Sequence, residues 1–311
     1  MKTTALFVFA AAMAGAQTGQ PAPPAPATSR QYLKARVYTA AEDSRILKLF
    51  EGIRVADTID ALDVIGLQGV TMMDRNIRPL WRDEQKLTHR IHGIALTVRL
   101  VPAQETSPKF ASHLAERAWE AEGWGPPPEL RAEGAGGRGA GFNALVRPGT
   151  VLVVDNQAID NGFCGSNMGL TLFGRGLRGF VGNQVCRDND EMILSRIPVY
   201  QDPLLAPRGI NQGRMWVESY NNPVVVGHVL VMPGDVIVAD SDGVAVVPRA
   251  RAEQVTEIAR WIYEDDEVKR GKIFDRIGKP RDWTVEGHTQ PPPPSDKPLH
   301  ADPVWTKRPR Q

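Results

Sequence analysis

Arg187 and Asp188 are the residues of this sequence whose types and position best suit chemistry. They end the stretch GFVGNQVCRD (179–188), in which an apolar run gives way to polar residues. A guanidinium is a planar fork that matches a carboxylate, and an Asp oxygen is a hard ligand suited to Mg²⁺ or Mn²⁺. The pair could therefore hold a 2-oxo acid by its carboxylate and, through a metal, by its oxo group. The alternative is an Asp that caps the next helix beside a solvated Arg.

A second anion-binding element is predicted just upstream of this pair. In NGFCGSNMGLTLFGRGLRG (161–179), glycines flank Ser166-Asn167-Met168 where a helix is expected to begin. The free backbone N–H groups at a helix N-terminus bind anions. We therefore expect a carboxylate-binding loop at the end of the preceding strand.

Several other chemistries are disfavoured by the residues present. No lysine occurs between Lys109 and Lys269, so carbonyl chemistry in the central stretch would use a metal ion, and not a Schiff base, as electron sink. The six histidines show no metal-ligand spacing. The loop GAGGRGAG (134–141) precedes a strand, whereas a dinucleotide-binding loop follows one. A formal charge of +1, from 37 basic and 36 acidic residues, gives no sign of a nucleic-acid or membrane surface.

The two cysteines, Cys164 and Cys186, each lie directly before a proposed site element. They are too far apart in sequence for a CxxC motif. In an oxidising compartment they could form a disulfide that locks the loop to the strand end. The alternative is that both are small buried apolar side chains.

Both ends of the chain differ in composition from its middle. MKTTALFVFAAAMAGAQ has a basic residue, a short apolar run and Ala14-Gly15-Ala16, which predicts a secretory signal (1–16) cleaved near Ala16. The protein is therefore expected to be secreted or periplasmic, with no lipid anchor and no membrane span. A Pro/Ala-rich linker (17–30) and a Pro-rich tail (289–311) are expected to lack structure, which leaves a folded unit at 31–288.

Between these ends, the patterns of helices and strands alternate. Val55, Ile59, Leu62 and Ile65 have helical spacing, and helices are also expected at about 107–123, 167–177, 189–196 and 249–270. Strands are expected at 93–101, 150–155 and 179–186 and in three runs after Pro223, with DSDG (240–243) as a hairpin turn. The segments 145–155 and 230–240 share seven of eleven residues. They are either duplicated units or two copies of a common turn and strand. The pattern favours an α/β or α+β fold with a mixed sheet.

Taken in order, these motifs resemble the family of regulator of ribonuclease activity A and the class II 4-hydroxy-4-methyl-2-oxoglutarate aldolases, whose members are often mislabelled dimethylmenaquinone methyltransferases. The similarity covers roughly 48–270 and includes RVADTIDALDVIG, IRPLW, GIALTVR, PGTVLVVD, GFVGNQVCRD, IPVY and the segment from PVVVGHVLV to GVAVVP. The stretch near 103–143 looks like an insertion. The resemblance implies an α/β fold of the swivelling β/β/α type, with a mixed sheet and flanking helices, and a homotrimer or hexamer.

The resemblance also implies a site. The family's backbone loop falls on Gly165, Ser166, Asn167 and Met168, which would bind the oxo acid. Arg187 would bind substrate and stabilise an enolate as the catalytic residue, and Asp188 would bind Mg²⁺ or Mn²⁺. An acidic residue from a neighbouring subunit's C-terminal helix is also implied, with Glu264 and Glu267 as candidates.

The sequence departs from the family pattern at two places. Ser166 stands where the family has an acidic residue, and Asn183-Gln184 replaces a frequent Asp-Gly. A hydroxyl is a poor substitute for a carboxylate base at neutral pH. Asp190 or Glu191 could compensate, or could only complement the helix N-terminus.

Three functions follow from these observations. The first is a metal-dependent lyase of small oxo acids, by aldol cleavage or by decarboxylation of an oxaloacetate-like substrate through a pyruvate enolate. The second is a protein-binding regulator, which a signal peptide argues against. The third is a non-catalytic oxo-acid binder, which the serine at 166 makes credible.

Overall fold

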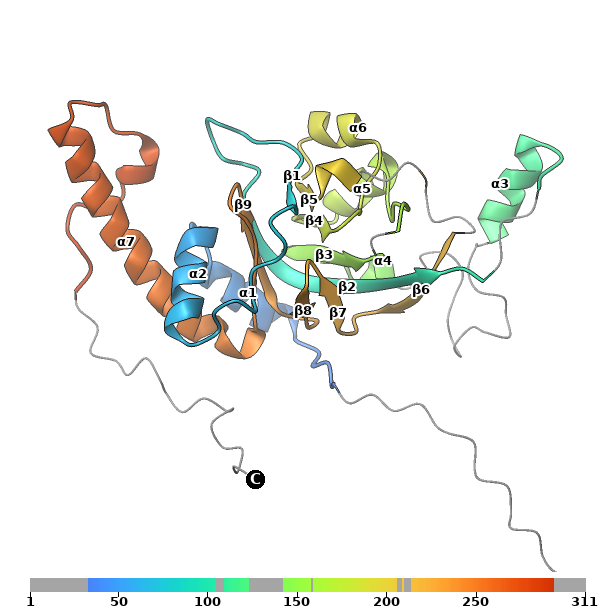
Figure 1. Ribbon diagram of the computed structural model, residues 1–311, viewed down its shortest axis with the longest axis horizontal. Helices are drawn as coiled ribbons and strands as arrows, with labels where there is room; N and C mark the ends of the chain where they lie inside the picture. Colours follow the sequence, from blue (N-terminus) through green and yellow to red (C-terminus); the bar gives the residue numbers. More distant parts are fainter. Residues whose placement is uncertain are drawn as a thin grey trace, which may run out of the picture. The chain divides into compact units, whose positions relative to one another are not determined.

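A mixed sheet organises the chain from Ala35 onward in the computed structural model (Figure 1). The structure describes residues 33–104, 109–122, 142–157, 159–205, 209 and 214–293. The expected signal peptide, the Pro/Ala-rich linker, the GAGGRGAG loop and the tail beyond Pro293 lie outside the described residues.

The main sheet has the strand order β1-β5-β4-β3-β2-β9-β10, with β6 also paired to β2. Its strands are β1 (Arg78–Pro79), β2 (Ile91–Pro102), β3 (Thr150–Asp155), β4 (Gly179–Gly182), β5 (Val199–Gln201), β6 (Met215–Tyr220), β9 (Val236–Asp240) and β10 (Gly243–Val247). A separate hairpin joins β7 (Val224–Val226) to β8 (Val229–Val231). Strands β2, β3, β4 and β5 run parallel, while β9, β10, β6 and β1 pair antiparallel. The sheet is therefore mixed.

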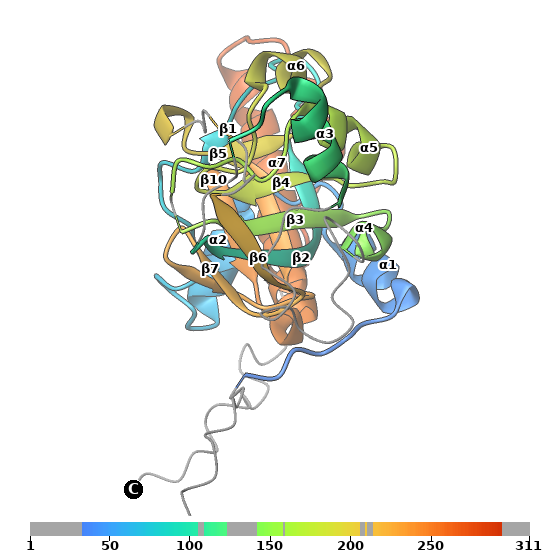
Figure 2. The ribbon, with the colours of Figure 1, turned by 90° about the vertical axis from the view of Figure 1, so that its right-hand side faces the viewer.

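The described helices lie before, between and after these strands. They are α1 (Ala40–Leu49), α2 (Val55–Val64), α3 (His113–Glu122), α4 (Phe142–Leu145), α5 (Ser166–Phe173), α6 (Asn189–Leu194) and α7 (Ala252–Arg276). Short 3₁₀ turns occupy Pro203–Leu205, Arg249–Arg251 and Trp283–Val285. Helix α5 connects β3 to β4 and α6 connects β4 to β5, as the crossover of parallel strands requires (Figure 2). None of the described helices is both long and apolar enough to cross a membrane.

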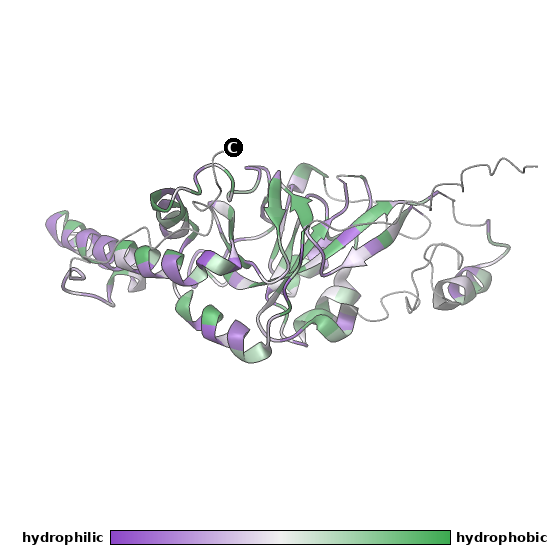
Figure 3. Ribbon diagram, turned by 90° about the horizontal axis from the view of Figure 1, so that it is seen from below, coloured by the Kyte–Doolittle hydropathy of each residue, from purple (hydrophilic) through white to green (hydrophobic). Residues whose placement is uncertain are grey.

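The central strand β2 is buried on both faces. Leu96 and Val98 pack with β3, β4, α5 and α6 in one cluster, and Ile94 on the same face packs with α1, α2 and α7. On the other face, Ile91 and Ala95 pack under the β7–β8 hairpin. Figure 3 shows the resulting apolar strands between helices whose outer positions are hydrophilic. The strand predicted at 93–101 is present, and its near-continuous burial is what cover on both faces requires.

The two similar segments form the same turn on opposite sides of β2. Gly149 and Gly234 both have φ +90°, a left-handed conformation that favours glycine. Ile94 pairs with the start of β3 in parallel and with Val236 of β9 in antiparallel orientation. The repeated Pro-Gly sequence is thus a shared way of starting a buried strand beside β2.

Most predicted elements are present, with shifted bounds. The helix expected at 167–177 is α5, which starts at Ser166 and ends at Phe173, and the hairpin expected at DSDG joins β9 to β10. The strand expected at 179–186 ends at Gly182, and only one isolated bridge, between Cys164 and Cys186, follows it. The expectation of an α/β fold with a mixed sheet and flanking helices is confirmed.

We expect stability to fall at acid pH because of His89. This buried ring accepts a hydrogen bond at Nδ1 from the Asp83 N–H (3.1 Å), and its Nε2 lies 3.0 Å from the Ser241 hydroxyl. Burial, and then the charge of Arg90, lower the pKa of His89 from its ordinary value of 6.5. As pH falls below about 6.5, the unfolded chain therefore binds more protons than the folded one. The contribution of neutral His89 to the free energy of unfolding is complete above that pH and is lost as the pH decreases through it.

Denaturant unfolding at a series of pH values tests this expectation. The His89→Gln variant should lose less unfolding free energy than wild type between about pH 7.5 and 6, whereas the exposed His113→Gln control should follow wild type. Below pH 6 a buried carboxyl acts with the opposite sign, since burial raises the pKa of Asp235 to about 6. Equal slopes for wild type and His89→Gln would contradict the assignment.

Candidate active site

Two loops meet at the carboxyl ends of the parallel strands β3 and β4. The loop after β3 leads into α5, and the loop after β4 leads through residues 183–188 into α6. The N–H groups of Phe163 and Cys164 both donate to the Val185 carbonyl, and the Arg187 N–H donates to the Cys164 carbonyl (3.0 Å). This edge of a parallel sheet is where ligands bind in open α/β folds.

Asp188 is held in an unusual conformation and faces the first loop. It has φ +59° and ψ +45°, in the left-handed region, and it occupies the N-cap position of α6. Its side chain makes no cap hydrogen bond. Instead, its Oδ2 accepts from the N–H (2.9 Å) and the hydroxyl (3.1 Å) of Ser166. The interpretation of Asp188 as a simple helix cap is therefore wrong, because the carboxylate joins the two loops.

Gly165 makes this approach possible. A Cβ atom built at this position would lie 2.5 Å from Oδ2 of Asp188 and 3.8 Å from Cγ of Arg187. A carbon atom 2.5 Å from a carboxylate oxygen would overlap it, so any side chain at position 165 would displace Asp188. The glycine expected in the anion-binding loop is thus required by the position of Asp188.

Arg187 lies half-buried beside the same carboxylate. Its Nε is 3.5 Å from Oδ1 of Asp188, too long for a good hydrogen bond. That Nε is buried and has no hydrogen-bond partner among the described residues. A buried donor without a hydrogen-bond acceptor is costly, and this Nε has only the long ion pair with Asp188, while 40% of the side chain is exposed.

The start of α5 offers two further donors. The Ser166 N–H is used by Asp188, and the Gly169 N–H is bonded to the Gly165 carbonyl. Neither the Asn167 nor the Met168 N–H has an acceptor in the described part of the chain. Free N–H groups at the positive end of a helix favour an anion.

A family model fits the stretch of chain that contains this arrangement. The model, described as RraA-like (Aldolase/RraA), matches residues 55–246, which is more than half of the chain. The chain belongs to the RraA-like family. The matched range includes both loops of the site.

The relatives and solved structures extend this finding. The chain is 31% identical over 135 residues, 42% of its own length, to a Halalkalibacterium halodurans protein provisionally named 4-hydroxy-4-methyl-2-oxoglutarate aldolase. It is 25% identical over 201 residues, 64% of its length, to Protein DlpA of Legionella pneumophila. The match spans 61% of the first relative and 27% of the second, less than two thirds of each.

A solved structure supports the fold. RraAS2 of Streptomyces coelicolor, described as an unusual member of the RNase ES inhibitor RraA protein family, aligns with a TM-score of 0.52 at 20% identity and covers 76% of this chain and 97% of that one. The chain therefore has the RraA-like fold.

For the metal expected in metal-dependent RraA-like aldolases, this site offers one protein ligand, Asp188. Oδ1 of Asp188 accepts no hydrogen bond from the described residues, lies 3.5 Å from Nε of Arg187, and belongs to a side chain that is 35% exposed. Within the described residues, no cluster of three or more His, Cys, Asp or Glu side chains could hold a metal ion. Mg²⁺ commonly binds through one or two carboxylates and keeps several waters. The residues present thus fit a hydrated cation bound at Asp188, and not an all-protein metal cage.

The acidic residues that could have replaced the missing carboxylate lie elsewhere. Asp190 and Glu191 are exposed in the first turn of α6 and complement its N-terminus. Glu267 of α7 is buried and accepts from the Gly287 N–H, with His288 Nδ1 2.6 Å from its carboxylate. Glu264 lies 3.8 Å from the same His288 ring. In this chain, His288 therefore engages both glutamates proposed from the C-terminal helix.

Sequence reasoning missed Gln201, which fixes the second loop. Its Oε1 accepts from the N–H groups of Val185 (2.9 Å) and Cys186 (2.8 Å), and its Nε2 donates to the Cys186 carbonyl (3.1 Å). All of these groups are buried. The available signal was a glutamine directly after the apolar run IPVY, where a buried strand seldom carries an amide. The buried Asn156, which donates to the Gln184 carbonyl, supports the same loop and was also missed.

We expect Gln201→Leu to destabilise the fold and displace the site. The substitution leaves three buried backbone groups without partners, each costing about 1–3 kcal/mol, so the free energy of unfolding should fall by about 3 kcal/mol or more. Chemical denaturation measures this loss, with Gln85→Leu at an exposed position as control. A change below about 1 kcal/mol would show that the loop holds itself in place.

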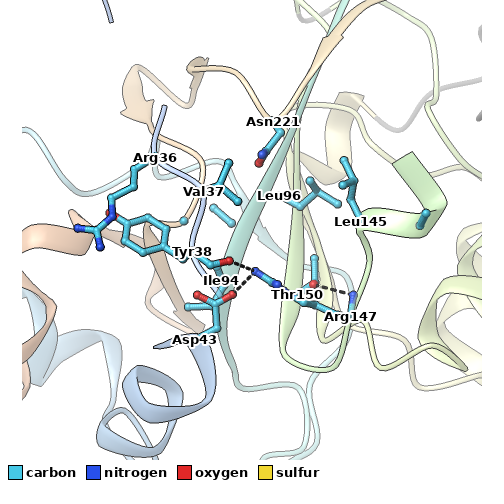
Figure 4. A pocket seen from close by; sticks show the side chains of 13 residues that line it. Arg36, Val37, Tyr38, Asp43, Ile94, Leu96, Leu145, Arg147, Thr150 and Asn221 are labelled. Carbon is cyan, nitrogen blue, oxygen red and sulfur yellow. Dashed lines mark hydrogen bonds and ion pairs between the residues drawn. The ribbon is translucent and has the colours of Figure 1, made fainter. Parts of the chain in front are cut away.

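A separate pocket lies at the opposite end of β3. It has a volume of about 180 Å³ and is bordered by the segment 36–38, α1 and the turn before β3. Figure 4 shows the side chain of Arg147 in this pocket, directed toward the Tyr38 carbonyl and the Asp43 carboxylate. The buried carboxylate of Asp43 also pairs with Arg249 (2.7 Å). The charged groups of Arg147 and Asp43 bond to each other here, whereas Nε of Arg187 has no hydrogen-bond partner among the described residues.

Proposed function

We propose that this protein is a divalent-metal-dependent lyase of small 2-oxo acids, and that its site favours decarboxylation of an oxaloacetate-like substrate over aldol cleavage. The observation that carries the proposal is the contact of Ser166 with Asp188. The serine donates both its N–H and its O–H to one carboxylate oxygen. It thereby fixes the aspartate beside Arg187 without adding a second negative charge.

Substrate binding would use the unpaired donors around this carboxylate. The buried Nε of Arg187 has no hydrogen-bond partner among the described residues and only a long ion pair with Asp188, while 40% of its side chain is exposed, and a guanidinium binds a carboxylate through parallel hydrogen bonds. The N–H groups of Asn167 and Met168 can hold a second carboxylate at the start of α5. An acid with two carboxylates close to an oxo group matches this set of donors.

A divalent cation on Asp188, when bound, supplies Lewis-acid polarisation of the oxo group. Arg187 would orient the substrate carboxylate and balance the negative charge that develops on the oxo oxygen. The hydrogen bonds from Ser166 keep one Asp188 oxygen occupied, which leaves the other oxygen to face the metal. The chain's own residues thus position the substrate and stabilise charge.

The absence of a carboxylate at 166 separates the two reactions. In decarboxylation the bond from C3 to the departing carboxylate breaks, CO₂ leaves with no proton to remove, and the resulting pyruvate enolate is protonated at C3. Aldol cleavage gives the same enolate but also requires a base to take the C4 hydroxyl proton. Ser166 is not such a base at neutral pH. Enolate stabilisation therefore survives in this site, while the general-base step lacks its usual residue.

We also propose export of the protein, on the basis of its signal-like N-terminus, and self-association through surfaces that include exposed apolar side chains of α5 and α6. Leu170, Phe173 and Leu194 are exposed there. Exposed apolar side chains can contribute to interaction surfaces. Cell fractionation and sedimentation of the purified protein test the two proposals separately.

Pyruvate release tests the lyase function directly. Oxaloacetate and 4-hydroxy-4-methyl-2-oxoglutarate are compared with Mg²⁺ or Mn²⁺ and with a chelator. We expect metal-dependent turnover that is faster with oxaloacetate. Arg187→Ala should lower kcat/KM by about 100-fold, since a hydrogen bond to a charged group contributes up to about 3 kcal/mol.

Arg175→Ala, at an exposed arginine just after α5, is the matched control, and a blank with metal but no protein corrects for decarboxylation by free metal. Faster aldol cleavage than decarboxylation would contradict the assigned preference. Absence of turnover, with Mg²⁺ and oxalate still bound in calorimetry, would contradict catalysis and support the alternative function of an oxo-acid-binding protein.

A further inference from the structure

Cys164 and Cys186, the only two cysteines of the chain, lie against each other beneath the two loops of the site. Their Sγ atoms are 3.1 Å apart, and both residues are fully buried. They also form an isolated parallel β-bridge. The thiols are thus brought together by backbone pairing as well as by side-chain packing.

The backbone between them suits a disulfide. Paired strands lie about 4.8 Å apart, and disulfide-linked residues have Cα atoms about 4.4–6.8 Å apart. The sulfurs need to approach by about 1 Å to reach a bond of about 2.05 Å. Hydrogen bonds already hold the segment on either side, from Cys164 N–H to Val185 and from Arg187 N–H to Cys164.

We propose that Cys164 and Cys186 form an intramolecular disulfide that ties the anion-binding loop to the Arg187–Asp188 turn. Gly165 follows one cysteine and Arg187 follows the other, so the bridge would stand one residue from each half of the site. The existence of the bridge does not depend on the proposed lyase function. Any influence of the bridge on pyruvate release would rest on that proposed function.

The bond requires an oxidant, for which a small disulfide such as oxidised glutathione suffices. One cysteine thiolate attacks it, forms a mixed disulfide and releases a thiol. The second cysteine then attacks the mixed disulfide and releases a second thiol. The two protein sulfurs are oxidised, the glutathione disulfide is reduced, and the two cysteine protons end on the two released thiols.

The bridge forms most readily during folding. In the native state both sulfurs are buried, so an oxidant in solution cannot reach them. Once formed, the bond is protected by the same burial. Oxidation before the loops close therefore gives a bridge that is slow to reduce.

Thiol counting on the full chain tests the proposal. The protein is refolded with oxidised glutathione, and the glutathione is then removed. The protein is next denatured without reductant, and its free thiols are titrated with a thiol reagent. We expect no titratable thiol, no bound glutathione by mass and a monomer on a non-reducing gel. Since the chain has only two cysteines, that result leaves one possible bond. Two free thiols, glutathione adducts or a disulfide-linked dimer would each overturn the proposal.

The melting temperature tests whether the bond ties the loops together. Closing a segment of this length should raise the melting temperature by roughly 6–12 °C over the reduced protein. The double variant Cys164→Ala/Cys186→Ala should not respond to reductant. Equal melting temperatures for oxidised and reduced wild type would contradict the tie. Neither readout involves turnover, so failure of the lyase function and failure of the disulfide are distinguishable.

Discussion

Asp188→Asn is expected to abolish metal-dependent pyruvate release, with a loss of about 1,000-fold or more in kcat/KM. Metal stabilisation of transition-state charge contributes several kcal/mol, and each 1.4 kcal/mol is a factor of ten in rate. Asn keeps the shape of the side chain and can still accept from Ser166 through its carbonyl oxygen. The substitution therefore removes the charge of the metal ligand while leaving the contact between the loops possible.

Calorimetry with Mn²⁺ provides a readout other than activity, because the variant should bind the ion far more weakly than wild type. Asp190→Asn, two residues further along and exposed in α6, is the matched control and should leave both binding and turnover unchanged. Similar losses in the two variants would indicate a general effect of negative charge near α6. Full activity in Asp188→Asn would remove Asp188 as the metal ligand.

Gly165→Ala is expected to lower activity by about 100-fold while leaving the rest of the sheet folded. The new methyl group would lie 2.5 Å from Oδ2 of Asp188, a distance that real Cβ contacts do not reach. The carboxylate would have to leave Ser166, so the variant should lose at least the two hydrogen bonds that hold it. A displacement of about 1 Å near reacting groups costs about this factor in rate.

The control for this variant lies at the other end of the same helix. A Cβ atom at Gly174 would meet only backbone oxygens at 3.4 and 3.6 Å, with an ordinary right-handed backbone, so Gly174→Ala should be tolerated. Circular dichroism checks that both variants fold, and steady-state kinetics measures the difference. An active Gly165→Ala enzyme would show that the contact of Asp188 with the first loop is dispensable.

The general architecture was predictable because its signals are local. Alternating helical and strand patterns, Pro-Gly turns and the DSDG hairpin each depend on residues close together in sequence, and they led to a mixed α/β fold. Bounds were less accurate where pairing decides them. Strand β4 ends at Gly182, well before the Arg-Asp pair, because the chain then turns to let Gln201 bond the backbone at 185 and 186.

The arrangement inside the site was less accessible to sequence reasoning. From the sequence, Ser166 is only a departure that removes a base, because its role as donor to Asp188 depends on a contact between residues 22 positions apart. Asp188 also has a left-handed backbone conformation, which the local sequence pattern did not predict. The structure brings the two loops together, while the roles of Arg187 and Asp188 in catalysis stay predictions.

The two similar segments that start β3 and β9 could compete for the same neighbour during folding. Both strands pair with β2 and carry nearly the same apolar residues, so the burial of apolar area barely distinguishes the native arrangement from one in which β3 and β9 exchange places. Chain direction separates them, since one partner runs parallel and the other antiparallel. Asp43 adds a second criterion, because this single buried carboxylate binds Arg147 from one turn and Arg249 beside the other. An ion pair at the edge of the sheet thus helps to specify which strand lies on which side.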